Sequence, residues 1–331
     1  MSYGNTEVSK SSKYINQVVN QKISPLLKDK LVFIGQEMCY ENAADIAQRL
    51  LGIQTNDTAI YRLTDEMGQQ MEEQVDEGKY HTIEKVEAKD VVYCQVDGSM
   101  LLTREEKWKE TKLGRVFKAS DIYSQTSDRQ WLRGSEYIAH LGHHNKFEEK
   151  ISHLLDKYEV CAERLVFIND GAPWIGNWIT AEYPRATQIL DFYHAMSHIS
   201  AYSKLCVLTK KANKEWLSQT AHILKTKGYE QTIKRLEKLK CNTKVKKEEK
   251  KKLFAYLGRN EYRMDYPSYI EKGWLIGSGA IESAHRTVLQ HRLKKSGQRW
   301  SKKGLKNIMR LRVINKSGHW DIITQKLRAV A

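Results

Sequence analysis

Prolines are scarce in this sequence, with only four among 331 residues, and no apolar stretch is long enough to cross a bilayer. Hydrophobic residues nevertheless make up 40% of the chain, which excludes a mainly disordered or collagen-like protein. The first residues, MSYGNTEVSKSSKY, contain no apolar segment of the kind that a secretory signal carries. We therefore expect a globular protein without a membrane anchor, long enough for two domains.

Cysteine pairs are also lacking. The five cysteines are scattered, odd in number and never spaced as CxxC. This arrangement argues against a disulfide framework and against a cysteine zinc site. We interpret the cysteines as reduced packing residues and expect a cytoplasmic protein.

Acidic residues are absent from a long segment near the end of the sequence. Between residues 283 and 320 there are eleven lysines and arginines and no aspartate or glutamate. Residues 1–90 hold 10 basic and 15 acidic residues, so the net charge of +15 leaves +20 for the remaining 241 residues. A polyanion is therefore the expected partner of this second part. A solvated basic helix is the alternative, but interleaved apolar residues such as Trp300 favour helices that present cations on one side.

The first 90 residues have helical periodicity, in ENAADIAQRLLG and again in TAIYRLTDEMG, with Gly52 between the two segments. Two short helices separated by a turn predict a helix-turn-helix, whose second helix, from about residue 57 to residue 67, would enter a major groove. This helix carries Arg62 as its only lysine or arginine, beside three acids. Dimerisation or plain packing therefore remains the alternative role for the segment.

Strand-like apolar runs begin after residue 90. They occupy residues 91–96, 113–119, 135–142, 164–169 and 186–190. Three strands in succession, followed by alternating helix and strand, predict a mixed α/β sheet. Residues 193–270 contain little strand pattern, so we expect a long helical excursion there.

Three acidic residues accompany these predicted elements. Asp97 and Asp170 each end an apolar run and precede glycine, and Glu282 follows Gly-Ser-Gly in the first turn of a predicted helix. Each has a simple alternative role, in a turn for the aspartates and at a positive helix end for the glutamate. Together, however, three carboxylates without basic partners would repel one another, and Mg²⁺ prefers such oxygen ligands. Two ions roughly 3.5–4 Å apart can promote phosphoryl transfer.

The order of Asp97, Asp170 and Glu282 resembles that of the DDE transposases, which have an RNase H-like catalytic domain. The segments FINDGAPWIGNWITAEYPRATQILDFYHA and IGSGAIESAHRTVLQHRLKKSGQRWS look like bacterial insertion-sequence transposases of the ISKra type, related to the Mutator-like group. That group has a D-x-x-H or C-x-x-H element after its second aspartate and a helical insertion before its glutamate. Here DFYH, from Asp191 to His194, is followed by the predicted helical excursion.

The resemblance spans residues 91–320 and implies a domain organisation. An RNase H-like α/β mixed sheet would be formed by residues 91–192 and 271–320, with residues 193–270 as a helical insertion. Residues 1–90, where the resemblance is less distinctive, would form a helical, helix-turn-helix-like N-terminal domain.

The resemblance also implies a site and a reaction. Asp97, Asp170 and Glu282 would be the catalytic metal ligands for Mg²⁺, with Mn²⁺ as a substitute, and Asp191 and His194 would support them. The protein would nick insertion-sequence ends and join the released 3′-hydroxyl to target DNA, with no covalent protein intermediate. Transposon ends and target, both double-stranded DNA, would be its partners, bound by a homodimer or larger assembly at the bacterial nucleoid. The expected DNA-binding residues are His285, Arg286, Arg292, Lys294, Lys295, Arg299, Lys302 and Lys303.

Three alternatives remain open. His194 and His198 lie one helical turn apart, so with Asp191 they could instead hold zinc. The protein could be a transposase-derived DNA-binding protein that no longer cuts, although such a protein would not need all three acids. It could also be a structure-selective nuclease on the same scaffold.

Overall fold

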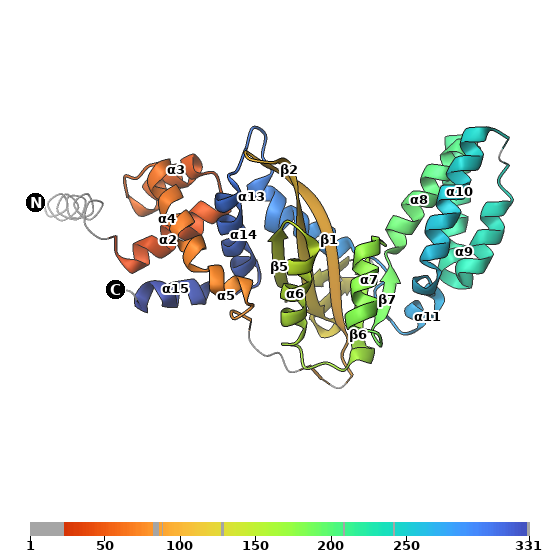
Figure 1. Ribbon diagram of the computed structural model, residues 1–331, viewed down its shortest axis with the longest axis horizontal. Coiled ribbons are helices and arrows are strands. Elements are labelled where there is room, and N and C mark those ends of the chain that lie inside the picture. The colour runs from red at the N-terminus through yellow and green to blue at the C-terminus, as the bar shows by residue number, and fades with distance from the viewer. Residues whose placement is uncertain are drawn as a thin grey trace, which may run out of the picture.

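The computed structural model describes residues 23–81, 86, 87, 89–126, 129–207, 209–240 and 242–329. A five-stranded sheet lies at the centre, between a helical group at one end and a long helical arm at the other (Figure 1). This architecture confirms the α/β class. Within the described ranges, none of the helices combines the length and apolar character that crossing a membrane requires.

The central sheet has the strand order β5-β2-β1-β6-β7. Its strands are β1 Val92–Thr103, β2 Lys107–Lys118, β5 Glu136–Leu141, β6 Leu165–Asn169 and β7 Thr187–Leu190. β2 pairs antiparallel with β1 and β5, whereas β6 pairs parallel with β1 and β7. Every residue of β6 is buried, as expected of an apolar strand covered on both faces. All five predicted strands are present, so the mixed sheet is confirmed.

The position of Asp97 differs from the prediction. β1 does not end at Asp97-Gly98 but continues to Thr103, and Gly98 pairs with Lys112 of β2. The strand persists because β2 satisfies its backbone after the parallel pairing with β6 ends at Cys94. The predicted strand end at Asp97-Gly98 is therefore wrong, and so is the alternative that these two residues form a turn. Asp170, by contrast, directly follows the end of β6, as predicted.

Helices cover both faces of the sheet. On one face lie α6 His144–Leu155 and α7 Pro173–Glu182, whose buried residues include Phe147, Ile151 and Trp178. The other face is covered by α12 Gly279–Ala284 and the π-helix η4 His285–Gln290, which share a core with Leu101 and Leu113. Short helices complete the central unit: η1 Ala119–Asp121, η2 Ala162–Arg164, η3 Glu261–Arg263 and α13 His291–Leu293.

The N-terminal helices share their core with helices from the end of the sequence. The N-terminal group comprises α2 Pro25–Glu37, α3 Tyr40–Leu51, α4 Asp57–Gln70 and α5 Glu72–Asp76. It packs against α14 Lys302–Lys316 and α15 Trp320–Ala329, with Met67 and Leu305 in one core cluster. Figure 1 shows α14 between the N-terminal helices and the sheet, where it also contacts β5. Residues 302–320, predicted in the catalytic domain, therefore also complete the core of the N-terminal group.

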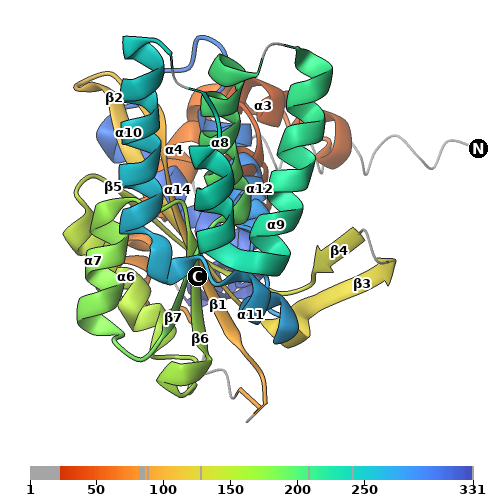
Figure 2. The same cartoon turned by 90° about the vertical axis from the view of Figure 1, so that its right-hand side faces the viewer.

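The predicted helical excursion is present as an arm beyond β7 (Figures 1 and 2). It contains α8 Phe192–Cys206, α9 Lys210–Glu237 and α10 Lys244–Arg259, and the chain returns through α11 Tyr266–Glu271. α9 is kinked at Gly228, whose φ of 76° favours glycine. Figure 2 also shows a separate hairpin, β3 Ile122–Thr126 and β4 Arg129–Leu132, projecting from the central unit. This hairpin was not predicted, because its short strands contain no continuous apolar run.

Candidate active site

Asp97 lies on β1, and Asp170 directly follows β6, the strand that pairs parallel with β1. Beyond the last backbone pair of β1 and β6, the Asn169 side chain accepts a 2.8 Å hydrogen bond from the Val96 backbone N–H. Asn169 is 3% exposed, so this bond fixes the strands to each other immediately before the two aspartates. The carboxylates are close enough that the charge of Asp170 raises the pKa of Asp97. The structure thus brings together the two strand-borne acids of the predicted site.

The Asp97 carboxylate is partly withdrawn from solvent. One of its oxygens accepts a 2.7 Å hydrogen bond from the Gly98 N–H, and the other lies 3.6 Å from Nε2 of His285. Burial raises its pKa most, and the Asp170 charge adds to this effect, while His285 opposes it. The ionised form of Asp97 is therefore disfavoured in the folded protein, which is typical of functional carboxylates.

His285 is buried rather than exposed. It is 3% exposed, neither ring nitrogen has a hydrogen-bond partner among the described residues, and burial lowers its pKa. The prediction that His285 contacts DNA is therefore wrong for this structure, because its ring packs under the helix and faces Asp97. A sequence pattern does not reveal this, since the π-helical turn that begins at His285 changes which residues face inward.

Glu282 is carried to the same side of the sheet by α12. The loop before this helix is bonded to β1 through Gln95, whose amide donates to the Gly277 carbonyl at 3.3 Å. Arg115 of β2 donates to the Ala280 carbonyl at 2.6 Å and so holds the first turn of α12. Glu282 itself is exposed, three residues before His285. The ligand atoms of Asp97, Asp170 and Glu282 do not all lie within 4.8 Å of one another in the described structure.

Asp191 joins two segments of the site. One carboxylate oxygen accepts from the His194 N–H at 2.5 Å and caps α8, and the other accepts from the Ser278 N–H. Asp191 is only 2% exposed. It therefore fixes the start of the helical arm to the loop that precedes Glu282, which is the supporting position that the resemblance implies.

His194 lies near the acids, where its charge would lower the pKa of Asp97. Its Nε2 is 3.1 Å from Nε2 of His198. Asp191 already binds two backbone N–H groups, and the three residues do not form a set of ligand atoms within 4.8 Å in the described part of the chain. This geometry does not favour the zinc alternative.

Tyr256 of α10 is a contributor that the sequence did not indicate. Its hydroxyl donates a 2.9 Å hydrogen bond to the backbone carbonyl of Asp170, and its ring stacks on His198 with centroids 4.1 Å apart. The helical arm thus contacts the loop that carries Asp170. No local pattern pointed to this residue, because the contact joins positions 86 residues apart.

The predicted DNA-binding residues differ in how far their side chains are exposed to solvent. Arg286, Lys294, Arg299 and Lys303 are exposed, and Lys295 and Lys302 are half-buried. The Lys302 ammonium pairs with Glu106.

Arg292, which we predicted to bind DNA, is fully buried. Its guanidinium donates twice to the Gly35 carbonyl, at 3.1 and 3.2 Å. The same group lies over the rings of Tyr40 and Trp300, 4.7 and 4.9 Å from their centroids. The prediction for Arg292 is therefore wrong, because this cation joins α2 and α3 to the segment before α14.

A groove lies between the predicted helix-turn-helix and the basic segment. Its volume is about 480 Å³, and its walls include Thr58 and Tyr61 of α4, Arg299, and Arg104 from the β1–β2 hairpin. The buried side of α4, including Ile60 and Met67, packs against the neighbouring helices. The exposed side of α4 and the basic segment therefore face a common space.

A second groove of about 580 Å³ runs beside α12. Exposed aromatic side chains line it, with Trp131 56% and Tyr193 63% exposed, and Arg115 and Ser283 also contribute. The Tyr193 ring lies so close to Gly277 that an added Cβ would be 2.7 Å from it. A side chain at this position would therefore displace the exposed Tyr193 ring.

The acids suit a hard divalent cation. Asp97, Asp170 and Glu282 offer only oxygen ligands, which Mg²⁺ and Mn²⁺ prefer. The negative charge of Asp170 also raises the pKa of Asp97, and a bound cation would offset this repulsion between the two carboxylates. The residue types present therefore match such an ion, and the three carboxylates would have to move closer together to hold it.

Comparison with known proteins identifies the family. Residues 14–325 match UPF0236, described as an uncharacterised protein family. Two relatives from Caldanaerobacter subterraneus subsp. tengcongensis, UPF0236 protein TTE0610/TTE0881/TTE1053/TTE2432 and UPF0236 protein TTE1650/TTE2708, are each 28% identical over 221 residues, or 65% of this chain. The matches cover 41% and 39% of the relatives, so the chain spans about two fifths of the length of these proteins. With its family match extending over most of its length, the chain belongs to UPF0236.

Proposed function

We propose that this protein is a DNA transposase with an RNase H-like catalytic domain, which cuts insertion-sequence ends and joins them to target DNA. The observation that carries the proposal is the placement of Asp97 on β1 and of Asp170 just after the neighbouring strand β6, with the helix of Glu282 docked on β1. The five-stranded mixed sheet and the helical arm between β7 and α12 agree with the resemblance to DDE transposases.

The acids would hold the divalent ions. Asp97, Asp170 and Glu282 would be the ligands, and bound Mg²⁺ would activate the attacking oxygen and stabilise the leaving one. Glu282 is exposed at the start of α12, so its side chain is free to turn towards the aspartates. Asp191 would keep α12 in register with the strands, because it binds the loop before that helix.

The remaining parts would position DNA. The exposed cations Arg286, Lys294, Arg299 and Lys303 would neutralise backbone phosphates, and the groove at α4 would receive a duplex. The aromatic groove beside α12 is suited to unpaired nucleotides at the cut end, because aromatic rings stack on bases of any sequence. Two ends must be held together for joining, so we propose a dimer or larger assembly on DNA.

The relatives' names give independent support. The name of one relative joins four designations, and the name of the other joins two. Each name stands for one protein of the same strain. Several copies of one coding sequence in a genome are the expected product of an element that moves its own gene.

The test is a cleavage and joining assay. The full chain would be incubated with labelled DNA from either side of its gene, supercoiled target and Mg²⁺ or Mn²⁺. A transposase gives a cut at the element boundary and a labelled joint product, and both are lost in Asp97→Asn, Asp170→Asn and Glu282→Gln. Asp321→Asn, which removes an exposed acid from α15, is the matched control.

Each other result assigns a different function. Binding of the end without cleavage identifies a transposase-derived DNA-binding protein. Cleavage of branched DNA without joining identifies a structure-selective nuclease. Either result would overturn the proposed transposase activity.

A further inference from the structure

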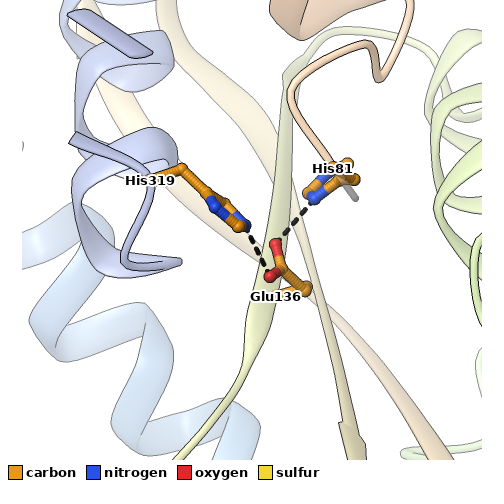
Figure 3. A group of neighbouring side chains, drawn as sticks. All are labelled: His81, Glu136 and His319. Atoms are coloured by element: carbon orange, nitrogen blue, oxygen red, sulfur yellow. Dashed lines mark hydrogen bonds and ion pairs between the residues drawn. The ribbon is translucent and has the colours of Figure 1, made fainter. Parts of the chain in front are cut away.

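Away from the acids, three side chains from distant parts of the sequence meet at one point (Figure 3). His81 follows the N-terminal helices, Glu136 begins β5, and His319 lies between α14 and α15. Nδ1 of His81 is 2.6 Å from one oxygen of Glu136, and Nε2 of His319 is 2.6 Å from the other. The cluster therefore connects the N-terminal helices, the sheet and the C-terminal helices.

The carboxylate in this cluster has an unusual set of partners. The side chains of His81, Glu136 and His319 are 1%, 14% and 19% exposed. Within the described ranges, no lysine or arginine pairs with Glu136, although the protein as a whole carries a net charge of +15. Burial raises the pKa of Glu136, but the hydrogen bonds from the two histidines outweigh this and hold the pKa below its usual value.

His81 is the most buried member of the cluster, with 1% of its side chain exposed. Its other nitrogen, Nε2, is buried without a hydrogen-bond partner among the described residues. The Glu136 carboxylate is largely buried between two imidazole rings, and a cation at this point would compensate its charge.

Two imidazole nitrogens and one carboxylate form a ligand set that zinc uses, with a fourth position for water. Magnesium and calcium prefer oxygen ligands and are poorly matched to this set. The ligand atoms all lie within 4.8 Å of one another. With zinc bonds of about 2.0–2.2 Å, tetrahedral ligand atoms are roughly 3.3–3.6 Å apart. Small rotations of the two rings would therefore open the hydrogen-bonded contacts enough to admit an ion.

We propose that His81, Glu136 and His319 bind one zinc ion, which fastens the N-terminal helices and the α14–α15 connection to the edge of the sheet. The site is separate from the acids, because Glu136 lies on the edge strand β5 and pairs with Val116 of β2. Its role would be structural, since it joins three segments and lies away from Asp97. The proposal does not depend on transposase activity.

The test uses Co²⁺ as a spectroscopic substitute for zinc. It is made in the Asp97→Asn protein, so that binding at the acids does not contribute. Tetrahedral Co²⁺ with nitrogen ligands absorbs visible light strongly, and the expected result is one equivalent bound with such a band, displaced by one equivalent of Zn²⁺. Glu136→Gln and His319→Gln should abolish the band. His144→Gln should retain it, because His144 also contacts a glutamate, Glu148, at 2.7 Å but belongs to no such three-residue group.

A stability measurement keeps the proposal testable if a variant folds poorly. Zinc at a hundredfold excess over its dissociation constant should raise the Tm of Asp97→Asn by about 5 °C. His319→Gln, whose circular dichroism is checked first, should show no rise. The zinc site would be overturned if Asp97→Asn showed neither the Co²⁺ band nor the rise in Tm. It would also be overturned if folded His319→Gln kept both. In either case the cluster would be only a pair of hydrogen bonds to Glu136.

Discussion

The Tyr256 hydroxyl, from the helical arm, donates a 2.9 Å hydrogen bond to the backbone carbonyl of Asp170. This contact makes the arm part of the support for the candidate site. It lies directly after β6, where Gly171 has a φ of 85° and its backbone is closely packed against Leu190 and Asn260. The position of Asp170 therefore depends on both the sheet and an element 86 residues away.

Tyr256→Phe should slow DNA cleavage without weakening DNA binding. Removing one hydrogen bond costs about 1 kcal/mol, so a loss of roughly fivefold in cleavage rate is expected if the bond positions Asp170. Single-turnover cleavage and a filter-binding titration would measure the two quantities. Tyr262→Phe is the control, because that side chain is 59% exposed and its hydroxyl bonds only the neighbouring Arg263 in the described structure. Equal rates for the two variants would contradict a positioning role.

Asp97→Asn should abolish metal-dependent cleavage, with a loss on the order of 10³ or more, because a ligand of the catalytic ions is removed. Binding of the DNA end should remain measurable by gel shift. Asp321→Asn should cut at the normal rate. Near-normal cleavage by Asp97→Asn would exclude the proposed site.

The same Asp97→Asn change should raise the Tm at pH 7. Burial and the Asp170 charge raise the pKa of Asp97, so its ionised form destabilises the folded state. This loss of folding stability is absent at pH values below the pKa of Asp97 in the unfolded chain. It is fully present at pH values above the raised pKa of Asp97 in the folded protein. Calorimetry at pH 7 and near pH 3.5 should therefore show a gain in Tm at the higher pH that shrinks at the lower. A gain of equal size at both pH values would show that the carboxylate charge is not its cause.

Replacing Lys294, Arg299 and Lys303 with glutamine should reduce the salt dependence of DNA binding. Each lost phosphate contact lowers the slope of log K against log salt by roughly 0.9. Fluorescence anisotropy at several salt concentrations would measure the slope. The control is a triple glutamine variant of exposed lysines on the helical arm: Lys244, Lys247 and Lys251. The assignment is rejected if both triple variants have the slope of the wild type.

Arg292→Gln should act on stability instead. It removes two buried hydrogen bonds to Gly35 and the cation–π contacts with Tyr40 and Trp300, at a cost of about 2–4 kcal/mol. Urea unfolding should show this loss, while the salt slope of DNA binding in the folded protein should stay unchanged. A lower slope with normal stability would restore Arg292 to the DNA-binding residues.

The strands could be predicted because their side chains are apolar over continuous runs, as in β6. The end of β1 could not, since it depends on pairing with β2, which keeps Asp97 and Gly98 inside the strand. Asp97 and Asp170 could be singled out from the sequence, because each is an acid that follows an apolar run and precedes glycine. The burial of His285 and Arg292 was not predictable from charge alone, because it is set by packing against segments far away in the sequence.

The contacts of Tyr256 and of the His81, Glu136 and His319 cluster were missed for a related reason. Each joins residues between 55 and 183 positions apart. Such pairs leave no local periodicity. They become visible only once the helices and the sheet have been placed relative to one another.

The shared position of α14 has a consequence for synthesis. Residues 302–316 complete the core of α2–α5 and also contact β5, yet they are translated after all three acids. A nascent chain halted between α12 and α14 would contain every proposed metal ligand but would lack the apolar partner of its first helices. Folding of the N-terminal group is therefore coupled to the synthesis of α14, so polypeptides that end before α14 would hold the acids without an assembled groove at α4.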